Sequence, residues 1–220
     1  MENPMVNYKK IIADTNSKMF NVGDSYKDNT LEVNQALCKM DRLPFSVGCI
    51  NVTGDLNVGM MIRSACLLGA ENFYIFGRKK FDSRSTVGAE NYINVVQYVF
   101  DDPINSDEDI YRKVVDLYLE KHDIVLCEHG GAQLGTFSWA QLIEDSHGFM
   151  ADGKLIKAKD YSQYTPLFLF GSESFGTPKC LLENHSFIKV SIPQLGVLRS
   201  FNVSAAFNII IWDYLKETFY

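Results

Sequence analysis

No stretch of this chain is apolar for long enough to cross a lipid bilayer. A membrane-spanning helix needs about 20 consecutive apolar residues, and the apolar runs within these 220 residues are all much shorter. The first ten residues, MENPMVNYKK, also lack the apolar segment of a secretory signal. We therefore expect a cytoplasmic protein without a membrane partner.

The usual sequence patterns of metal sites and disulfide frameworks are also missing. The five cysteines are scattered without CxxC spacing, and the four histidines are not paired at the spacing of a metal site. We expect buried thiols in a reducing compartment and no metal. Because 46% of the residues are hydrophobic, the chain can form one sizeable core.

Basic residues are not in excess, and the net charge of −6 argues mildly against nucleic acid as a partner. The acidity is local, because residues 100–128 carry nine acidic and three basic side chains, whereas the rest of the chain carries 18 of each. The remainder of the chain is therefore neutral on balance and does not by itself repel phosphate.

Short apolar segments alternate with helical patterns from residue 45 onward. This alternation predicts an α/β fold with a largely parallel sheet. Residues 1–44 are expected to form a polar, partly helical extension with Thr30 as a helix cap, and residues 130–165 an inserted lid or hairpin. We expect strands at residues 45–52, 73–76, 93–100, 124–127, 167–170 and 187–192, and helices at residues 57–69, 108–122 and 203–219. Asn57 and Asn202 are expected to cap the first and the last of these helices.

Two of the expected helices carry more apolar surface than one core face requires. In the last helix, Ile209 and Trp212 lie outside the main apolar stripe, and in the first helix Arg63 lies between Met60 and Leu67 on the side opposite the core stripe. Such a second face is either covered within the domain or meets another subunit. An arginine between two apolar residues favours a site at a subunit interface.

Two loops that follow apolar strands form candidate halves of one ligand pocket. Residues 171–178 read GSESFGTP, which lacks the lysine of a P-loop, and no GxGxxG follows a strand, so neither nucleotide motif is present. The segment also fits an ordinary turn with Thr177 as helix cap and Pro178 at the first helical position. The second loop, residues 192–204, has Ser200 and Asn202 as polar side chains before the last helix.

Three segments together resemble the motifs of the SpoU/TrmH group of SPOUT RNA methyltransferases. These segments are N-x-G-x-x-x-R-S-A from Asn57, F-G-S-E-x-x-G from Phe170, and I-P-x-x-G-x-x-x-S-F-N-V-S from Ile192. Phe201 replaces the usual leucine before the asparagine of the third motif. The resemblance covers about residues 45–220, and it implies a SPOUT-type α/β fold with a mainly parallel sheet and a deep C-terminal trefoil knot. It also implies S-adenosyl-L-methionine as methyl donor, a homodimer, and methylation of a ribose 2′-hydroxyl in RNA.

The resemblance also implies roles for individual residues. Arg63 would act on the substrate, although its guanidinium is too basic to be an ordinary general base. We expect it to grip a phosphate and to favour the alkoxide electrostatically. The catalytic residues implied are Arg63, Asn57, Glu173, Ser200 and Asn202. The cofactor-binding residues implied are Phe170, Gly171, Gly176, Ile192, Leu195, Gly196, Ser200 and Asn202.

RNA binding requires basic side chains, and two kinds of position offer them. Basic residues lie beside aromatic ones after the second expected strand and in the insertion at residues 154–164, and Arg199 lies next to the serine of the third motif. The RNA-binding residues expected are Arg78, Lys79, Lys80, Arg84 and Arg199. The 44-residue extension is too short for a separate ribosomal-RNA-recognition domain, which favours tRNA over ribosomal RNA. Ribosomal RNA methylation, base methylation, a non-catalytic RNA-binding protein and an enzyme of another nucleotide remain alternatives.

Overall fold

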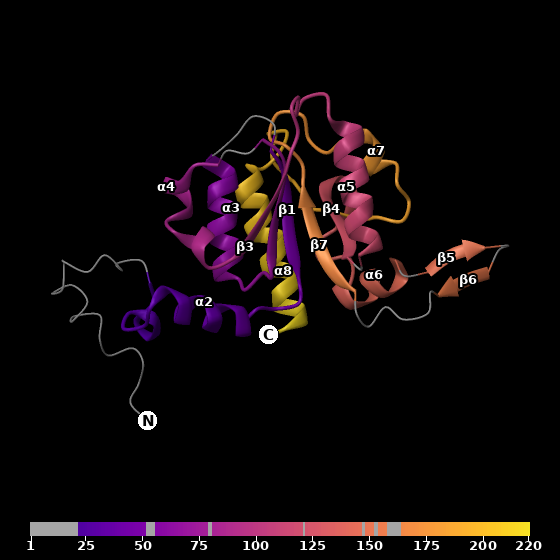
Figure 1. The fold of residues 1–220 in the computed structure, drawn as a ribbon. Helices are drawn as coiled ribbons and strands as arrows, with labels where there is room; N and C mark the ends of the chain where they lie inside the picture. The colour runs from indigo at the N-terminus through magenta and orange to yellow at the C-terminus, as the bar shows by residue number, and fades with distance from the viewer. Residues whose placement is uncertain are drawn as a thin grey trace.

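The protein is built around one six-stranded sheet in which every pair of neighbouring strands is parallel. The computed structural model describes residues 22–51, 56–78, 81–120, 122–146, 148–151, 154–157 and 164–220, with side chains outside residues 148–157. The strand order is β3-β2-β1-β7-β4-β8 (Figure 1). The strands are β1 (Ser46–Asn51), β2 (Asn72–Gly77), β3 (Asn94–Val99), β4 (His122–Gln133), β7 (Thr165–Phe170) and β8 (Ile188–Ser191).

Both faces of the sheet are covered, because successive strand residues point to opposite sides. In β2, Phe73 and Ile75 join the core beneath α3 (Leu56–Leu67) and α8 (Val203–Thr218), whereas Tyr74 and Phe76 join the core beneath α5 (Asp107–Leu119). Figure 1 shows α3 and α8 together on one side of the sheet and α5 on the other. The predicted α/β class and the predicted strands are confirmed.

The start of the described chain forms a short helical unit beside this body. The helix α2 (Leu31–Met40) follows a 3-10 turn, η1 (Asp24–Tyr26), and the Thr30 side chain accepts a hydrogen bond from the Val33 amide, as predicted for its cap. Asn34 is fully buried and donates to the Tyr26 carbonyl at 2.8 Å. Between β2 and β3 lie two further short elements, α4 (Ser83–Thr86) and η2 (Ala89–Asn91).

Residues 130–165 contain the end of β4, a helix and a hairpin. The helix α6 (Trp139–Ser146) is fixed to α8 by the Trp139 indole, which donates to Asp213 at 3.0 Å, and by the Trp139 amide, which donates to Glu217 at 2.7 Å. The antiparallel pair β5 (Gly148–Ala151) and β6 (Lys154–Lys157) follows. It extends from the body beside α6, on the side away from α2 (Figure 1).

Two predicted helix caps were wrong. Asn57 lies inside α3, which already begins at Leu56, so its side chain is free to bond elsewhere. The short helix α7 (Lys179–Leu182) is preceded by Pro178 as its N-cap, one residue later than the predicted Thr177. The trefoil knot stays a prediction. No helix in the described part of the chain has both the length and the apolar character needed to cross a membrane.

Candidate active site at the carboxyl edge of the sheet

A cleft of about 780 Å³ lies where the carboxyl ends of β7, β4 and β8 meet. Ligands of open parallel sheets bind at this edge, because the loops that follow the strands converge there. Six of the predicted cofactor residues line the cleft, namely Phe170, Gly171, Gly176, Ile192, Ser200 and Asn202.

The loop after β7 is a closed turn of fixed shape. Ser172 and Gly176 exchange both backbone hydrogen bonds, at 2.9 and 2.8 Å, and the Phe175 amide donates to the Ser172 hydroxyl at 3.0 Å. Gly176 has a φ of +70°, which favours glycine. A Cβ on Gly171 would lie 2.5 Å from the Gly176 carbonyl carbon, so no side chain fits there. The turn therefore holds Glu173 at its exposed tip.

A chain of hydrogen bonds connects the three motif segments at one end of the cleft. The Asn57 side-chain amide donates to Glu173 Oε2 at 2.7 Å, and the Asn202 amide donates to Asn57 Oδ1 at 3.1 Å. Asn57 lies in the first turn of α3, Glu173 in the loop after β7, and Asn202 at the start of α8. The structure thus brings together side chains that are up to 145 positions apart in the sequence.

The side-chain amide of Asn202 both caps α8 and donates a hydrogen bond to Asn57. Its Oδ1 caps α8, as predicted, by accepting from the Ser204 amide at 3.0 Å and from the Ala205 amide at 3.4 Å. The Ser204 hydroxyl donates to the same oxygen at 2.7 Å. With its oxygen engaged, the amide is fixed so that Nδ2 points to Asn57.

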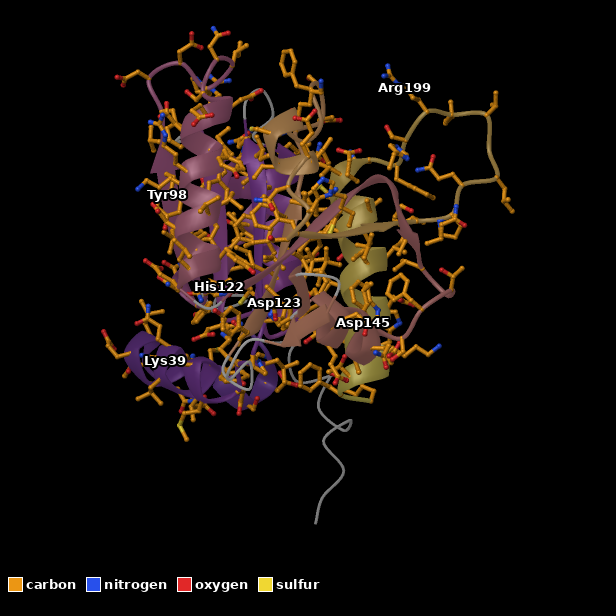
Figure 2. All side chains as sticks on the ribbon, turned by 90° about the vertical axis from the view of Figure 1, so that its right-hand side faces the viewer. Lys39, Tyr98, His122, Asp123, Asp145 and Arg199 are labelled. Carbon is orange, nitrogen blue, oxygen red and sulfur yellow. The ribbon has the colours of Figure 1, made fainter. Side chains whose placement is uncertain are left out.

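The loop between β8 and α8 divides into a part that lines the cleft and a part that does not. Arg199, Ser200 and Phe201 line the cleft. Leu195, whose side chain is fully exposed at 103%, and Gly196 are not among the lining residues. Figure 2 shows Arg199 on this outlying loop, far from His122 and Asp123 at the start of β4.

Arg63 lies on the exposed side of α3 and does not line the cleft of its own chain. It is six residues after Asn57, which corresponds to about 9 Å along the helix and nearly two turns. Its neighbours on this face are Met60, 44% exposed, and Leu67, 77% exposed. The helix α3 packs against α8, on which Trp212 is 53% exposed.

Comparison with known proteins identifies the family. The profile of the SpoU rRNA Methylase family matches residues 44–212. The chain belongs to this family. In a comparison with curated protein sequences, no significant match was found.

Solved structures of the SpoU family have the same fold. The TrmH/SpoU tRNA modifying enzyme of A. aeolicus has a TM-score of 0.60 at 16% identity, with 85% of this chain and 81% of that chain covered. The methyltransferase AviRb of Streptomyces viridochromogenes, in complex with AdoMet, has a TM-score of 0.53 at 21% identity, over 80% of this chain. The AdoMet-bound rRNA methyltransferase of Sinorhizobium meliloti has a TM-score of 0.56 at 20% identity, over 81% of this chain. This chain covers only 60% and 58% of the latter two chains.

The predicted RNA-binding residues of this SpoU-family chain have different surroundings. Arg78, Arg84 and Arg199 are all exposed, and Arg84 also donates two side-chain hydrogen bonds of 2.9 and 3.0 Å to Asp82. Lys79 and Lys80 lie outside the described residues, as do the side chains of the basic cluster at 154–159.

Sequence reasoning missed the part of the cleft that β4 supplies. Cys127, Glu128 and His129 all line it. Burial raises the pKa of the Cys127 thiol well above 9.0, with a smaller contribution from Glu128, so this thiol stays protonated and unreactive at neutral pH. Among the described residues, no group of three His, Cys, Asp or Glu side chains could hold a metal ion.

Proposed function

We propose that this chain transfers the methyl group of S-adenosyl-L-methionine to a ribose 2′-hydroxyl of RNA. The observation that carries the proposal is the hydrogen-bonded chain Glu173–Asn57–Asn202, because it gathers the three motif segments at one end of a cleft large enough for a nucleoside. The AdoMet named in the structures of AviRb and of the S. meliloti enzyme supports the choice of cofactor.

The cofactor would lie against the backbone of the two loops that line the cleft. Gly171 lets the loop after β7 pack closely on its own backbone, because a Cβ there would lie 2.5 Å from the Gly176 carbonyl carbon. Ile192 lines the cleft after β8 and offers an apolar surface for adenine, and Ser200 and Asn202 line the cleft as polar groups. Leu195 and Gly196 would contact the cofactor only if their loop folded over the cleft.

The reaction forms a bond between the ribose oxygen and the methyl carbon and breaks the bond between that carbon and the sulfonium sulfur. The hydroxyl proton is lost to solvent. The methyl group is already activated by the positive sulfur, so the protein chiefly aligns the two reactants. Glu173 and Asn57 would orient the ribose, and the Arg63 guanidinium would hold the neighbouring phosphate and stabilise the developing oxyanion.

Arg63 can take part in this reaction if two copies of the chain associate. It lies on the outer face of α3 among exposed apolar residues, and α8, which packs against α3, also exposes Ile209 and Trp212. Exposed apolar surface of this kind favours a protein–protein interface. We therefore propose a homodimer through α3 and α8, in which Arg63 of one copy reaches the cleft of the other.

We favour tRNA as the substrate and the cytoplasm as the location. The A. aeolicus relative is described as a tRNA modifying enzyme, and this chain covers 81% of it. Arg78 and Arg199 are exposed and available to bind phosphate. All five cysteines are free, in keeping with a reducing compartment.

Arg63→Ala tests the mechanism, and ligand screening tests the cofactor. In a thermal-shift assay, S-adenosylmethionine should raise the melting temperature while NAD and ATP should not, because only a bound ligand stabilises the folded state. Arg63→Ala should abolish methyl transfer and keep this shift. Retained turnover in Arg63→Ala would show that the arginine is not catalytic.

A further inference from the structure

Strand β4 contains a wide bulge at the wall of the cleft. Cys127 and Ala132 both pair with Val190 of β8, so the four residues between them have no partner in the ladder. Their sequence is Glu-His-Gly-Gly, and the first two line the cleft. Bulges of this kind redirect side chains and are common beside active sites.

The two glycines fix the shape of this bulge. Gly130 has a φ of +82°, and a Cβ on Gly131 would lie 2.4 Å from the carbonyl carbon of Lys189. The Ser191 hydroxyl donates to the Gly131 carbonyl at 2.9 Å and ties the bulge to β8. The glycines therefore allow the bulge to form, and the bond to Ser191 holds it against β8 at the wall of the cleft.

Glu128 uses this position to face the loop after β7. Its Oε1 accepts from the His129 amide at 3.0 Å, and its Oε2 accepts from the Thr177 amide at 3.1 Å. Each carboxylate oxygen has two lone pairs, so both oxygens can accept one further hydrogen bond. The side chain is half-buried and lines the cleft, where such a bond would be partly shielded from water.

The order of the strands places Glu128 near the middle of the cleft. At one end of the cleft Glu173 follows β7 and accepts a hydrogen bond from Asn57, and the apolar end with Ile192 lies after β8. Strand β4 is between β7 and β8, and neighbouring strands are about 4.8 Å apart. If the cofactor bound with adenine at the apolar end and the sulfonium near Glu173, its ribose would lie between them, within reach of Glu128 on β4.

We propose that Glu128 binds the ribose of S-adenosylmethionine by accepting hydrogen bonds from its 2′- and 3′-hydroxyls. A carboxylate with two free lone pairs matches two neighbouring hydroxyl donors, and such bonds to a charged acceptor are stronger than those between neutral groups. Glu128 would then position the cofactor along the cleft. The inference rests on the proposed cofactor and adds a residue outside the three motif segments.

The test compares S-adenosylhomocysteine with its 2′,3′-dideoxy form by titration calorimetry. Glu128→Gln keeps the size of the side chain and an acceptor for the Thr177 amide but removes the charge. Glu120→Gln is the matched control, because Glu120 is an exposed carboxylate near the opposite end of β4. The wild-type chain and the control should bind the dideoxy form at least about tenfold more weakly, the value expected for hydrogen bonds to a charged group.

In Glu128→Gln, the difference between the two ligands should fall to about threefold or less. If the variant weakens both ligands by the same factor, or changes neither, Glu128 does not bind the ribose and the inference is wrong. The proposed cofactor would survive that result. If the wild-type chain does not bind S-adenosylhomocysteine at all, the proposed function itself fails.

Discussion

The hydrogen bond between Asn57 and Glu173 should be measurable as a coupling free energy. A bond to a charged acceptor is worth about 1.5–3 kcal/mol when buried. Glu173 is exposed and Asn57 half-buried, so we expect about 1 kcal/mol for the 2.7 Å contact. Asn57 also accepts from Asn202 at 3.1 Å, which adds about 1 kcal/mol for a bond between neutral groups.

These values predict the outcome of a double-mutant cycle. Asn57→Ala should destabilise the fold by about 2 kcal/mol, Glu173→Ala by about 1 kcal/mol, and the double variant by about 2 kcal/mol, so the coupling is about 1 kcal/mol. For a domain of this size, Asn57→Ala should lower the melting temperature by about 4–8 °C. Urea unfolding measures the free energies, at one protein concentration because a dimer's stability depends on it.

Additive effects in this cycle would show that Asn57 and Glu173 are not coupled. The double variant would then lose about 3 kcal/mol, the sum of the two single effects. The same three variants also report on the reaction. If Asn57 acts by orienting Glu173, the double variant should transfer methyl groups no more slowly than the slower single variant.

Three further predictions concern Gly171, Asn202 and His122. Gly171→Ala should destabilise by about 1–3 kcal/mol in urea unfolding, because its Cβ would lie 2.5 Å from backbone. Gly196→Ala is the control, because no atom lies within 4 Å of its added Cβ, and it should change the free energy of unfolding by less than about 0.5 kcal/mol. Equal destabilisation by the two alanine variants would show that the close backbone contact at Gly171 is not the cause. Asn202→Ala should lose about 1 kcal/mol of helix capping and also the bond to Asn57, whereas Asn202→Ser should keep the cap and lose only that bond. A serine variant as unstable as the alanine variant would show that capping does not contribute. Burial lowers the pKa of His122 below 6.5, so the folded state favours neutral imidazole. The contribution of His122 to the free energy of unfolding is then complete above about pH 6.5 and is lost as the pH drops through the folded-state pKa. His122→Asn should therefore flatten this part of the plot of unfolding free energy against pH. An unchanged plot would show that His122 is not the group responsible.

The fold followed closely from local sequence patterns, and so did two of the helix starts. The strands β1, β2, β7 and β8 are largely buried, and short apolar runs bounded by polar residues make such strands easy to recognise. Thr30 and Asn202 cap helices as predicted, because a short polar side chain before an apolar helical pattern is a local signal. Asn57 gave the same signal and was misjudged, since its amide bonds to Glu173, a residue 116 positions away.

The contribution of β4 to the site could not be recognised from local patterns. In the sequence, the apolar strand ends at Cys127 and Glu-His-Gly-Gly reads as the start of a loop. In the structure, pairing with β8 resumes at Ala132, and only this long-range contact turns the four residues into a bulge. The surroundings of Arg63 could not be recognised from local patterns either. The periodicity of α3 places this residue away from the core but does not show which cleft it faces.

The most direct test of the central claim locates the methyl group after transfer. The purified chain is incubated with tRNA and S-adenosylmethionine that carries a deuterated methyl group, and the RNA is digested to nucleosides for mass spectrometry. We predict that the label appears in one 2′-O-methylated nucleoside and is absent with Arg63→Ala. A label on a nucleobase, or no label in tRNA or ribosomal RNA while the cofactor binds, would contradict the account.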